Sequence, residues 1–257
     1  MTFTIARFAV LAASLCGMAQ VSAAPIEAKL GARAPATLIT KCSQPNTVAL
    51  TFDDGPYTWT TNLVDLLEEN GVNGTFFFNG NNFGCIYDEA NVARVKYVYD
   101  KGHQVASHTW AHKNLPDLSG DELLSEFTRI DDAIQKITGA VPAFIRPPYG
   151  AYDDEVLEVA GSVGQTVVTW DFDSRDTAGF SPAQSKDLYN QLILSSPDTV
   201  LTLNHETHQG TVDEVIPYAI QQFKAKGYRM VTVAECLGAT PYQSTGSPSP
   251  RDSSWTC

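Results

Sequence analysis

Short apolar segments alternate with amphipathic helical patterns along the chain from Thr47 onwards. Each apolar segment is a few residues long and favours a strand, whereas the segments between them have the three- and four-residue spacing of helices. This alternation is typical of repeated βα units and a largely parallel sheet. Seven strands are predicted: Val48–Phe52, Thr75–Phe78, Gln104–Ser107, Ala143–Arg146, Thr166–Trp170, Val200–Asn204 and Arg229–Val231.

Three helices stand out between these strands. The clearest follows Ser119, where Glu122 would complete a capping box, and it ends at Gly139 after a regular apolar face. The other two run near residues 61–70 and 212–226, and each is closed by a glycine. The pattern therefore predicts an α/β fold, and a chain of 257 residues is long enough for one large domain of this kind.

The two ends of the chain differ from this pattern. Residues 1–23 contain one charge, Arg7, then an apolar run from Phe8 to Cys16 and small residues up to Ala23, which is typical of a cleavable secretory signal peptide. Residues 24–41 and 239–257 are expected to be irregular, which leaves 42–238 as the folded domain. We therefore expect a secreted protein, extracellular or in the cell wall.

The charge balance narrows the possible partners. With 17 basic and 29 acidic residues the formal net charge is −12, which disfavours nucleic acid and anionic membranes because both require a basic surface. Outside the signal no apolar stretch approaches the ~18 residues that a membrane span needs. A neutral polymer remains compatible with this composition.

Four of the five cysteines lie beyond the signal segment, and an oxidising compartment would pair them in one of three ways. We favour Cys42 with Cys236, because the first precedes the first strand and the second follows the last. Cys85 would then pair with Cys257. A zinc–thiolate site is the weaker alternative, since no two cysteines have CxxC spacing.

Polar residues gather at or just after the ends of five different predicted strands. They are Asp53-Asp54, His108, Arg146, the segment Asp173 to Asp176, and His205. Functional sites of barrels and open α/β sheets lie at the carboxyl ends of their strands, so these segments could converge on one pocket. Charged residues that merely mark loops would explain any one cluster, but not why nearly all the histidines share this edge.

Two of these clusters have the residue types of a metal site. His108 and His112 are four residues apart and would share one face if the segment turned helically. By itself an HxxxH pair is more often coincidental than functional. Asp53 and Asp54 stand where a strand breaks at Gly55, so the two carboxylates require a cation or an arginine nearby, although Asp-Gly is also a common turn.

The segments TFDDGP, SHTWAH, RPPYG and LNH occur in this order, and together they resemble the polysaccharide deacetylase family, carbohydrate esterase family 4. The resemblance covers roughly residues 47–237 and is closest in appearance to secreted fungal chitin deacetylases. It implies a distorted (β/α) barrel with about seven parallel strands. It also makes residues 42–238 the catalytic domain.

The resemblance implies a role for each residue that matches a family motif. Asp54, His108 and His112 would bind one divalent metal ion, Zn²⁺ or Co²⁺, and three protein ligands leave further coordination positions open. Asp53 would be the catalytic base. Arg146 would hold its carboxylate ionised and correctly aimed.

The family also implies a general acid and contacts to the acetyl group. His205 has the position of the acid, and a carboxylate would hold it, with Asp176 the first candidate and Asp173 the second. Tyr149 offers the first backbone N–H after two prolines and would stabilise an oxyanion, and Leu203 would face the acetyl methyl group. We also expect Trp110 to stack on a sugar ring, although burial is an ordinary role for each of these side chains.

These features predict an amidohydrolase that removes N-acetyl groups from chitin or chitooligosaccharides. Acetylxylan esterase and peptidoglycan deacetylase are alternatives with the same chemistry, and a carbohydrate-binding protein without turnover is an alternative from another class. We expect a monomer.

Overall fold

The computed structural model describes residues 1, 2 and 34–257, and the folded unit belongs to the second of these ranges. The predicted signal peptide, residues 1–23, and the first part of the segment 24–41 lie almost entirely outside the described residues. None of the helices in the described part has both the length and the apolar character needed to cross a bilayer.

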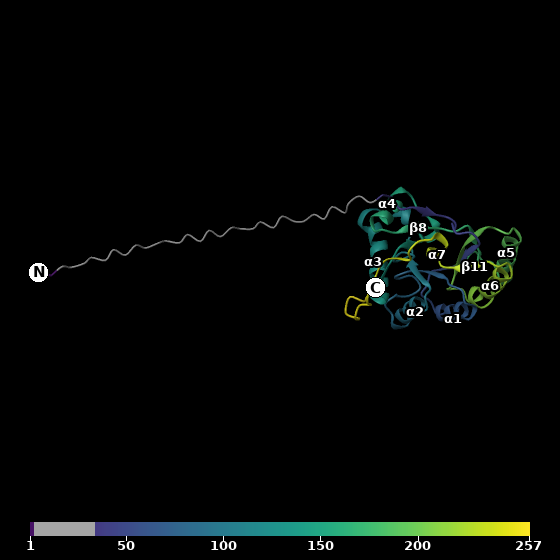
Figure 1. Cartoon of the computed structure of the whole chain (residues 1–257), viewed down its shortest axis with the longest axis horizontal. Helices are drawn as coiled ribbons and strands as arrows, with labels where there is room; N and C mark the ends of the chain where they lie inside the picture. Colours follow the sequence, from purple (N-terminus) through teal and green to yellow (C-terminus); the bar gives the residue numbers. More distant parts are fainter. Residues whose placement is uncertain (3–33) are drawn as a thin grey trace. The chain divides into compact units, whose positions relative to one another are not determined.

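A parallel sheet forms the centre of the folded unit (Figure 1). Neighbouring strands run in the order β1, β8, β7, β5, β4, β3, β10, β2 and β11, and β9 pairs with β10. Because β9 follows β8 in the chain, its pairing with β10 links the two sides of the sheet and gives the barrel-like arrangement that was predicted. The strands are β1 Leu38–Ile39, β2 Thr47–Ala49, β3 Thr51–Asp53, β4 Thr75–Phe78, β5 Gln104–Ser107, β6 Ala140–Pro142, β7 Phe144–Ile145, β8 Thr166–Val168, β9 Phe172–Asp173, β10 Thr199–His205, β11 Arg229–Val231 and β12 Tyr242–Thr245.

Helices surround these strands, and α7 lies over the middle of the view in Figure 1. Most of their apolar faces pack on the outside of the sheet in a large core that includes Phe52, Val105 and Phe223. The helices are α1 Thr60–Asn70, α2 Glu89–Asp100, α3 Gly120–Thr138, α4 Asp154–Ser162, α5 Pro182–Leu194, α6 Ile216–Ala225 and α7 Val233–Leu237, with short 3₁₀ turns at Leu115–Asp117 and Pro148–Gly150 and a π-helical turn at Thr211–Val215.

Small and medium apolar side chains form a separate cluster that includes Ala49, Phe77 and Ala106 from the strands. Val233 and Ala234 of α7 belong to the same cluster. The N-terminus of α7 has a complete capping box between Thr232 and Glu235, which fixes where this short helix begins. Helix α7 therefore closes the end of the barrel at which the parallel strands begin.

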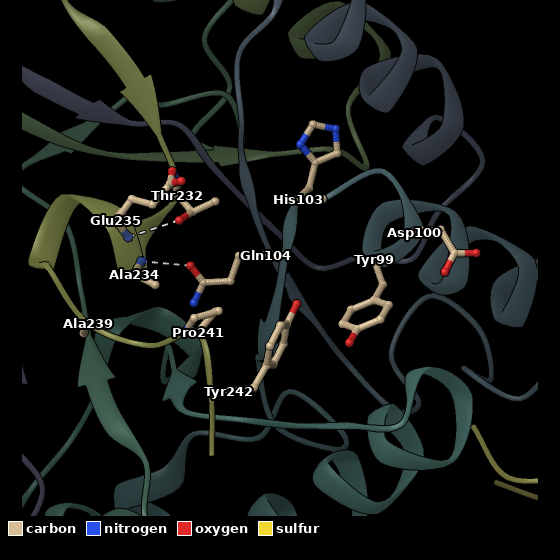
Figure 2. Close-up of a pocket in the computed structure, with 11 residues that line it drawn as sticks. Tyr99, Asp100, His103, Gln104, Thr232, Ala234, Glu235, Ala239, Pro241 and Tyr242 are labelled. Carbon is tan, nitrogen blue, oxygen red and sulfur yellow. Dashed lines mark hydrogen bonds between the residues drawn. The ribbon is translucent and has the colours of Figure 1, made fainter. Parts of the chain in front are cut away.

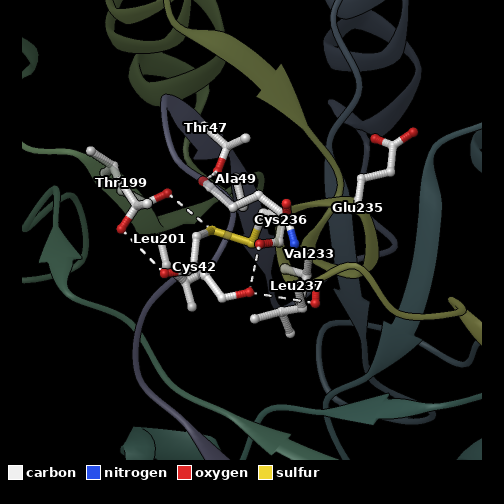
Figure 3. Close-up of a disulfide and its surroundings, with 12 residues drawn as sticks. Cys42, Thr47, Ala49, Thr199, Leu201, Val233, Glu235, Cys236 and Leu237 are labelled. Carbon is white, nitrogen blue, oxygen red and sulfur yellow. Dashed lines mark hydrogen bonds between the residues drawn. A yellow bond between two sulfur atoms is a disulfide. The ribbon is translucent and has the colours of Figure 1, made fainter.

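Both predicted disulfides are present. Cys42 pairs with Cys236 across 194 residues, and Figure 3 shows this bond between the segment before β2 and helix α7. Cys85 pairs with Cys257 across 172 residues and fastens the C-terminal segment to the loop after β4. The first bond thus lies at the α7 end of the barrel, opposite the carboxyl ends of the strands.

The strand predictions are confirmed in position, with differences in length. The strands β4, β5 and β11 have the predicted bounds, whereas the first predicted strand is interrupted at Leu50 and becomes β2 and β3. Two segments predicted to be irregular each contain a strand: β1 pairs with β8, and β12 pairs antiparallel with β6. These strands gain their order from long-range pairing, which a local pattern does not reveal.

The three predicted helices are present, but their details differ from the prediction. Helix α3 ends at Gly139 in the left-handed conformation, as expected, but Ser119 forms no capping hydrogen bond. The predicted capping box is wrong because Glu122 instead accepts a hydrogen bond from Lys113 at 2.7 Å. The pattern did not single out α2, α4, α5 and α7, which are also present.

Candidate metal centre

A pocket of about 240 Å³ lies where the carboxyl ends of the strands meet. The side chains that line it come from segments far apart in the sequence, so the predicted convergence of the strand ends is confirmed. The lining residues are Asp53, Asp54, His108, His112, Pro147, Tyr149, Trp170, Thr177, Leu203 and His205.

Three of these side chains form a group that could hold a metal ion. Asp54, His108 and His112 each offer one ligand atom, and the three atoms lie within 4.8 Å of one another. The Nε2 atoms of His108 and His112 are 3.4 Å and 3.2 Å from the same carboxylate oxygen of Asp54. Two imidazoles and one carboxylate are a common ligand set for catalytic zinc and for related divalent ions.

The hydrogen bonds around this group fit a cation. The Nδ1 atom of His108 lies 2.7 Å from the backbone oxygen of Arg146, so Nδ1 carries the proton and the Nε2 lone pair faces Asp54. Oδ1 of Asp54 is buried and makes no hydrogen bond with any residue in the described part of the chain. Lone pairs and a negative charge that face one another are stabilised by a positive ion between them.

Unusual backbone conformations bring the three ligands together. Asp54, Thr109 and His112 have positive φ angles of 73°, 70° and 53°, although none is a glycine. The segment from His108 to His112 does not turn helically, because the chain bends through these left-handed residues instead. The two imidazole centroids are nevertheless only 5.0 Å apart. Such strain persists only where the surrounding structure fixes the backbone, which is frequent at functional sites.

Asp53 and Arg146 form a buried ion pair beside the metal group. Nη1 of Arg146 donates to Oδ1 of Asp53 at 2.9 Å, and the two side chains are 0% and 2% exposed. Burial lowers the pKa of Arg146, and the charge of Asp53 opposes this effect. Nη2 donates to the backbone oxygen of Thr169 at 2.8 Å, and the guanidinium lies over the Phe77 ring at 4.3 Å. The arginine therefore fixes the Asp53 carboxylate in one orientation.

A second buried charged pair lies on the other side of the pocket. Nδ1 of His205 is 2.8 Å from Oδ1 of Asp176, whose other oxygen accepts hydrogen bonds from the His205 backbone and the Thr211 hydroxyl. Burial alone would lower the pKa of His205, but Asp176 outweighs it and raises the pKa to about 9. Asp173, the second candidate, instead accepts from the backbone N–H of Arg175 at 2.7 Å.

Two of the three predicted substrate contacts line the pocket. Leu203 does so from β10, and Tyr149 is 70% exposed at the rim with its ring 4.8 Å from that of His112. Within residues 34–257 the backbone N–H of Tyr149 has no hydrogen-bond acceptor, so it is available to a bound molecule.

The prediction that Trp110 contacts substrate is wrong. Trp110 is 4% exposed, and its ring packs against Arg129 at 3.9 Å and against Tyr87. Trp170 and Thr177 line the pocket instead. Trp170 stands at the end of a predicted strand, just before the acidic segment. This position in the sequence is the signal that could have predicted its place in the pocket.

A larger cavity of about 560 Å³ lies at the other end of β5 and is shown in Figure 2. Its walls come from the end of α2, the start of β5, α7 and the segment that follows it. Gln104 there accepts a hydrogen bond from the backbone of Ala234, and its buried amide nitrogen has no partner among residues 34–257. None of the predicted site residues lines this cavity.

Comparisons with known proteins agree with these features. Residues 40–168 match the family described as polysaccharide deacetylase. A chitin deacetylase from a Pestalotiopsis species is 40% identical over 256 residues, which are 94% of this chain and 84% of the relative. The structure of the chitin deacetylase from Colletotrichum lindemuthianum is similar with a TM-score of 0.77 at 35% identity, covering 80% of this chain and 94% of that chain.

The crystal structure of a peptidoglycan N-acetylglucosamine deacetylase is also similar. Its TM-score is 0.73 at 28% identity, and the match covers 81% of this chain and 96% of that chain. The same fold is therefore found in proteins named for two different polymers.

The geometry of the metal group gives a first prediction. His112→Ala and Asp54→Ala should each weaken binding of Zn²⁺ or Co²⁺ more than about 100-fold, because losing even an outer-shell partner typically costs 10–100-fold. Equilibrium dialysis with a competing chelator would measure the change. His208→Ala is the control, because His208 lines a different small cavity and should leave affinity unchanged. Unaltered binding in both ligand variants would contradict the assignment.

Proposed function

The chain belongs to the polysaccharide deacetylase family, and from this we infer that it is a metal-dependent hydrolase that removes N-acetyl groups from the N-acetylglucosamine units of chitin or chitooligosaccharides. The products are acetate and the free amine of chitosan. The observation that carries this proposal is the presence, in one pocket, of a three-ligand metal group, a buried carboxylate and a buried histidine, which Asp176 holds from behind the pocket wall.

Asp54, His108 and His112 would hold the divalent ion, and zinc and cobalt both suit this ligand set. When bound, such an ion lowers the pKa of water and polarises the acetyl carbonyl. The protein orients the His108 ring through its bond to the Arg146 backbone. The same arginine thus positions one ligand through its backbone and Asp53 through its side chain.

Asp53 acts as the general base that takes the proton from the attacking water. Its carboxylate faces the pocket and lies 3.9 Å from Nε2 of His108, so it is close to the ligand group without belonging to it. Arg146 donates to the Asp53 carboxylate at 2.9 Å and fixes its orientation at this buried position. A base that is already held in place needs no rearrangement before proton transfer.

His205 acts as the general acid that protonates the leaving amine. An amide nitrogen leaves poorly unless it receives a proton, and Asp176 keeps His205 protonated up to about pH 9. The backbone N–H of Tyr149 stabilises the developing oxyanion, and Leu203 contacts the acetyl methyl group. Trp170 provides an aromatic wall beside them.

Acetylxylan and peptidoglycan are the alternative substrates, because the same chemistry acts on both. An ester depends less on a general acid than an amide, so the buried His205–Asp176 pair favours an amide substrate. The net charge of −12 disfavours an anionic polymer. A carbohydrate-binding protein without turnover is disfavoured because the base, the acid and the ligands are all present in the pocket.

Acetate release from chitin oligomers, acetylxylan and peptidoglycan, measured in parallel, tests the proposal. We expect the highest kcat/KM on chitin oligomers and loss of activity after treatment with EDTA. A higher kcat/KM on either other polymer would change the assigned substrate. Binding of chitin oligomers without acetate release would exclude an enzyme.

Asp53→Asn should lower kcat by about 10²–10⁴-fold while the metal remains bound, because the variant loses the base but none of the three ligands. The substitution also leaves the buried Arg146 charge unpaired, which costs about 3–5 kcal/mol of stability. Circular dichroism and metal content should therefore be measured on the same sample. Near wild-type kcat in a folded, metal-loaded variant would show that Asp53 is not the base.

The pH profile tests the His205–Asp176 pair. A general acid works only when protonated, so wild-type kcat/KM should fall as the pH rises through about 9. Asp176→Asn removes the interaction that raises the pKa of His205, and burial then lowers this pKa. The alkaline limb of the kcat/KM profile should therefore shift to lower pH by at least about one unit. Asp173→Asn is the matched control, because Asp173 bonds to Arg175. An unchanged limb in Asp176→Asn would remove His205 from this role.

We further propose that the protein is secreted as a monomer after cleavage near Ala23. The signal-like residues 1–23 and the two disulfides support export. Protein recovered from the medium should begin near Ala24 by N-terminal sequencing and have a monomer mass by light scattering. Retention inside the cell with an intact N-terminus would contradict export.

A further inference from the structure

Glu206 is a fully buried acidic side chain that the proposed chemistry does not use. It directly follows His205 at the end of β10 and is 0% exposed, but it does not line the pocket. Buried carboxyl groups are expensive unless they are hydrogen-bonded, so a group at this position requires an explanation.

The Glu206 carboxyl packs against the turn that follows the two aspartates. Its Oε1 accepts a hydrogen bond from the Thr60 hydroxyl at 2.5 Å, and that hydroxyl oxygen accepts from the backbone N–H of Tyr57 at 2.9 Å. A methyl group on Gly55 would lie only 1.9 Å from the same Oε1. Glu206 therefore contacts both ends of the Gly55–Thr60 turn, and only glycine fits beneath it.

This turn contains the strained ligand. His205 pairs with Asp53 in the β10–β3 register, and this is the last pair between the two strands. Asp54, with a φ of 73°, comes next and has no strand partner to fix it. The contact of Glu206 with Gly55 and Thr60 attaches the chain again immediately beyond Asp54. Asp54 is thus held from both sides, as a strained residue must be.

We propose that Glu206 is a positioning residue that holds the Asp54–Thr60 turn against the end of β10 and so keeps the Asp54 carboxylate directed toward His108 and His112. It has no contact with substrate, and it acts only through Gly55 and Thr60. The consequence for activity depends on the function proposed above, whereas the consequence for metal affinity does not.

The chemical form of Glu206 identifies the informative substitutions. Burial raises the pKa of Glu206 to about 8, against the effect of the Thr60 hydrogen bond, so the group is mostly uncharged at neutral pH. Glutamine has the same shape and keeps an oxygen acceptor for Thr60. Leucine has a similar size but cannot accept a hydrogen bond. Thr60→Val removes the donor from the other side of the same contact.

The experiment measures Zn²⁺ and Co²⁺ affinity by chelator competition in Glu206→Leu, Glu206→Gln and Thr60→Val. Glu206→Leu should weaken binding by about 10–100-fold, as for loss of other outer-shell partners, and Glu206→Gln should weaken it clearly less. Thr60→Val should weaken it about tenfold or more, and adding Thr60→Val to Glu206→Leu should cause little further loss because both disrupt one contact. Glu158→Leu, at an exposed position on α4, is the matched control.

A second measurement separates positioning from general destabilisation. At saturating metal, kcat in Thr60→Val should recover toward wild type, whereas a misfolded site would not recover. Thr60→Val also keeps the proposal testable if Glu206→Leu does not fold. Unchanged metal affinity in Thr60→Val, or equal losses in the leucine and glutamine variants, would overturn the proposal. Weakened affinity in a protein that releases no acetate from chitin would leave the positioning role intact and contradict only the proposed function.

Discussion

The buried ion pair between Arg146 and Asp53 is the interaction on which the rest of the site depends. Two charges removed from water are stable only when their geometry and remaining hydrogen bonds are satisfied. The two terminal nitrogens of Arg146 bond to Asp53, Thr51 and the carbonyl oxygen of Thr169, which belong to two different parts of the sheet, and only its Nε has no hydrogen-bond partner within the described residues. Its own carbonyl oxygen sets the tautomer of His108. One residue therefore connects the base, a metal ligand and the barrel wall.

The barrel provides the rigid support for this pair. Parallel pairing from β3 to β8, and the return through β9 and β10, brings the carboxyl ends of the strands to one side. The α7 helix and one disulfide close the other side. Each side chain in the pocket therefore lies at or just after the end of its own strand. The ligands and the acid can thus be adjusted by loops without a change in the core.

Sequence reasoning succeeded where local pattern and position in the fold coincide. Strand ends predicted the convergence of Asp54, His108 and His205, and position relative to the first and last strands predicted the pairing of Cys42 with Cys236. These features depend on order along the chain, which a sequence contains. The α/β class followed from the same alternation of strands and helices.

Features that depend on three-dimensional packing could not be predicted from the sequence. Trp110 stands beside a ligand in the sequence, yet left-handed bends turn its ring into the core against Arg129. The spacing of His108 and His112 was compatible with a shared site, but the left-handed bends that bring their rings together are not visible in that spacing. Glu206 and Thr60 are 146 residues apart, and no local pattern relates them. Backbone strain and buried polar contacts require coordinates to be seen.

The two cross-links also determine how the protein would respond to proteolysis. Residues 177–181 form an exposed loop between Asp176 and the start of α5, and this loop lies inside both disulfide-closed segments, 42–236 and 85–257. A single cut there would leave two fragments joined by two covalent bonds. Asp176 and His205 would fall on different fragments but could not diffuse apart. A nicked molecule would therefore migrate as an intact chain on a denaturing gel until a reductant released the two pieces.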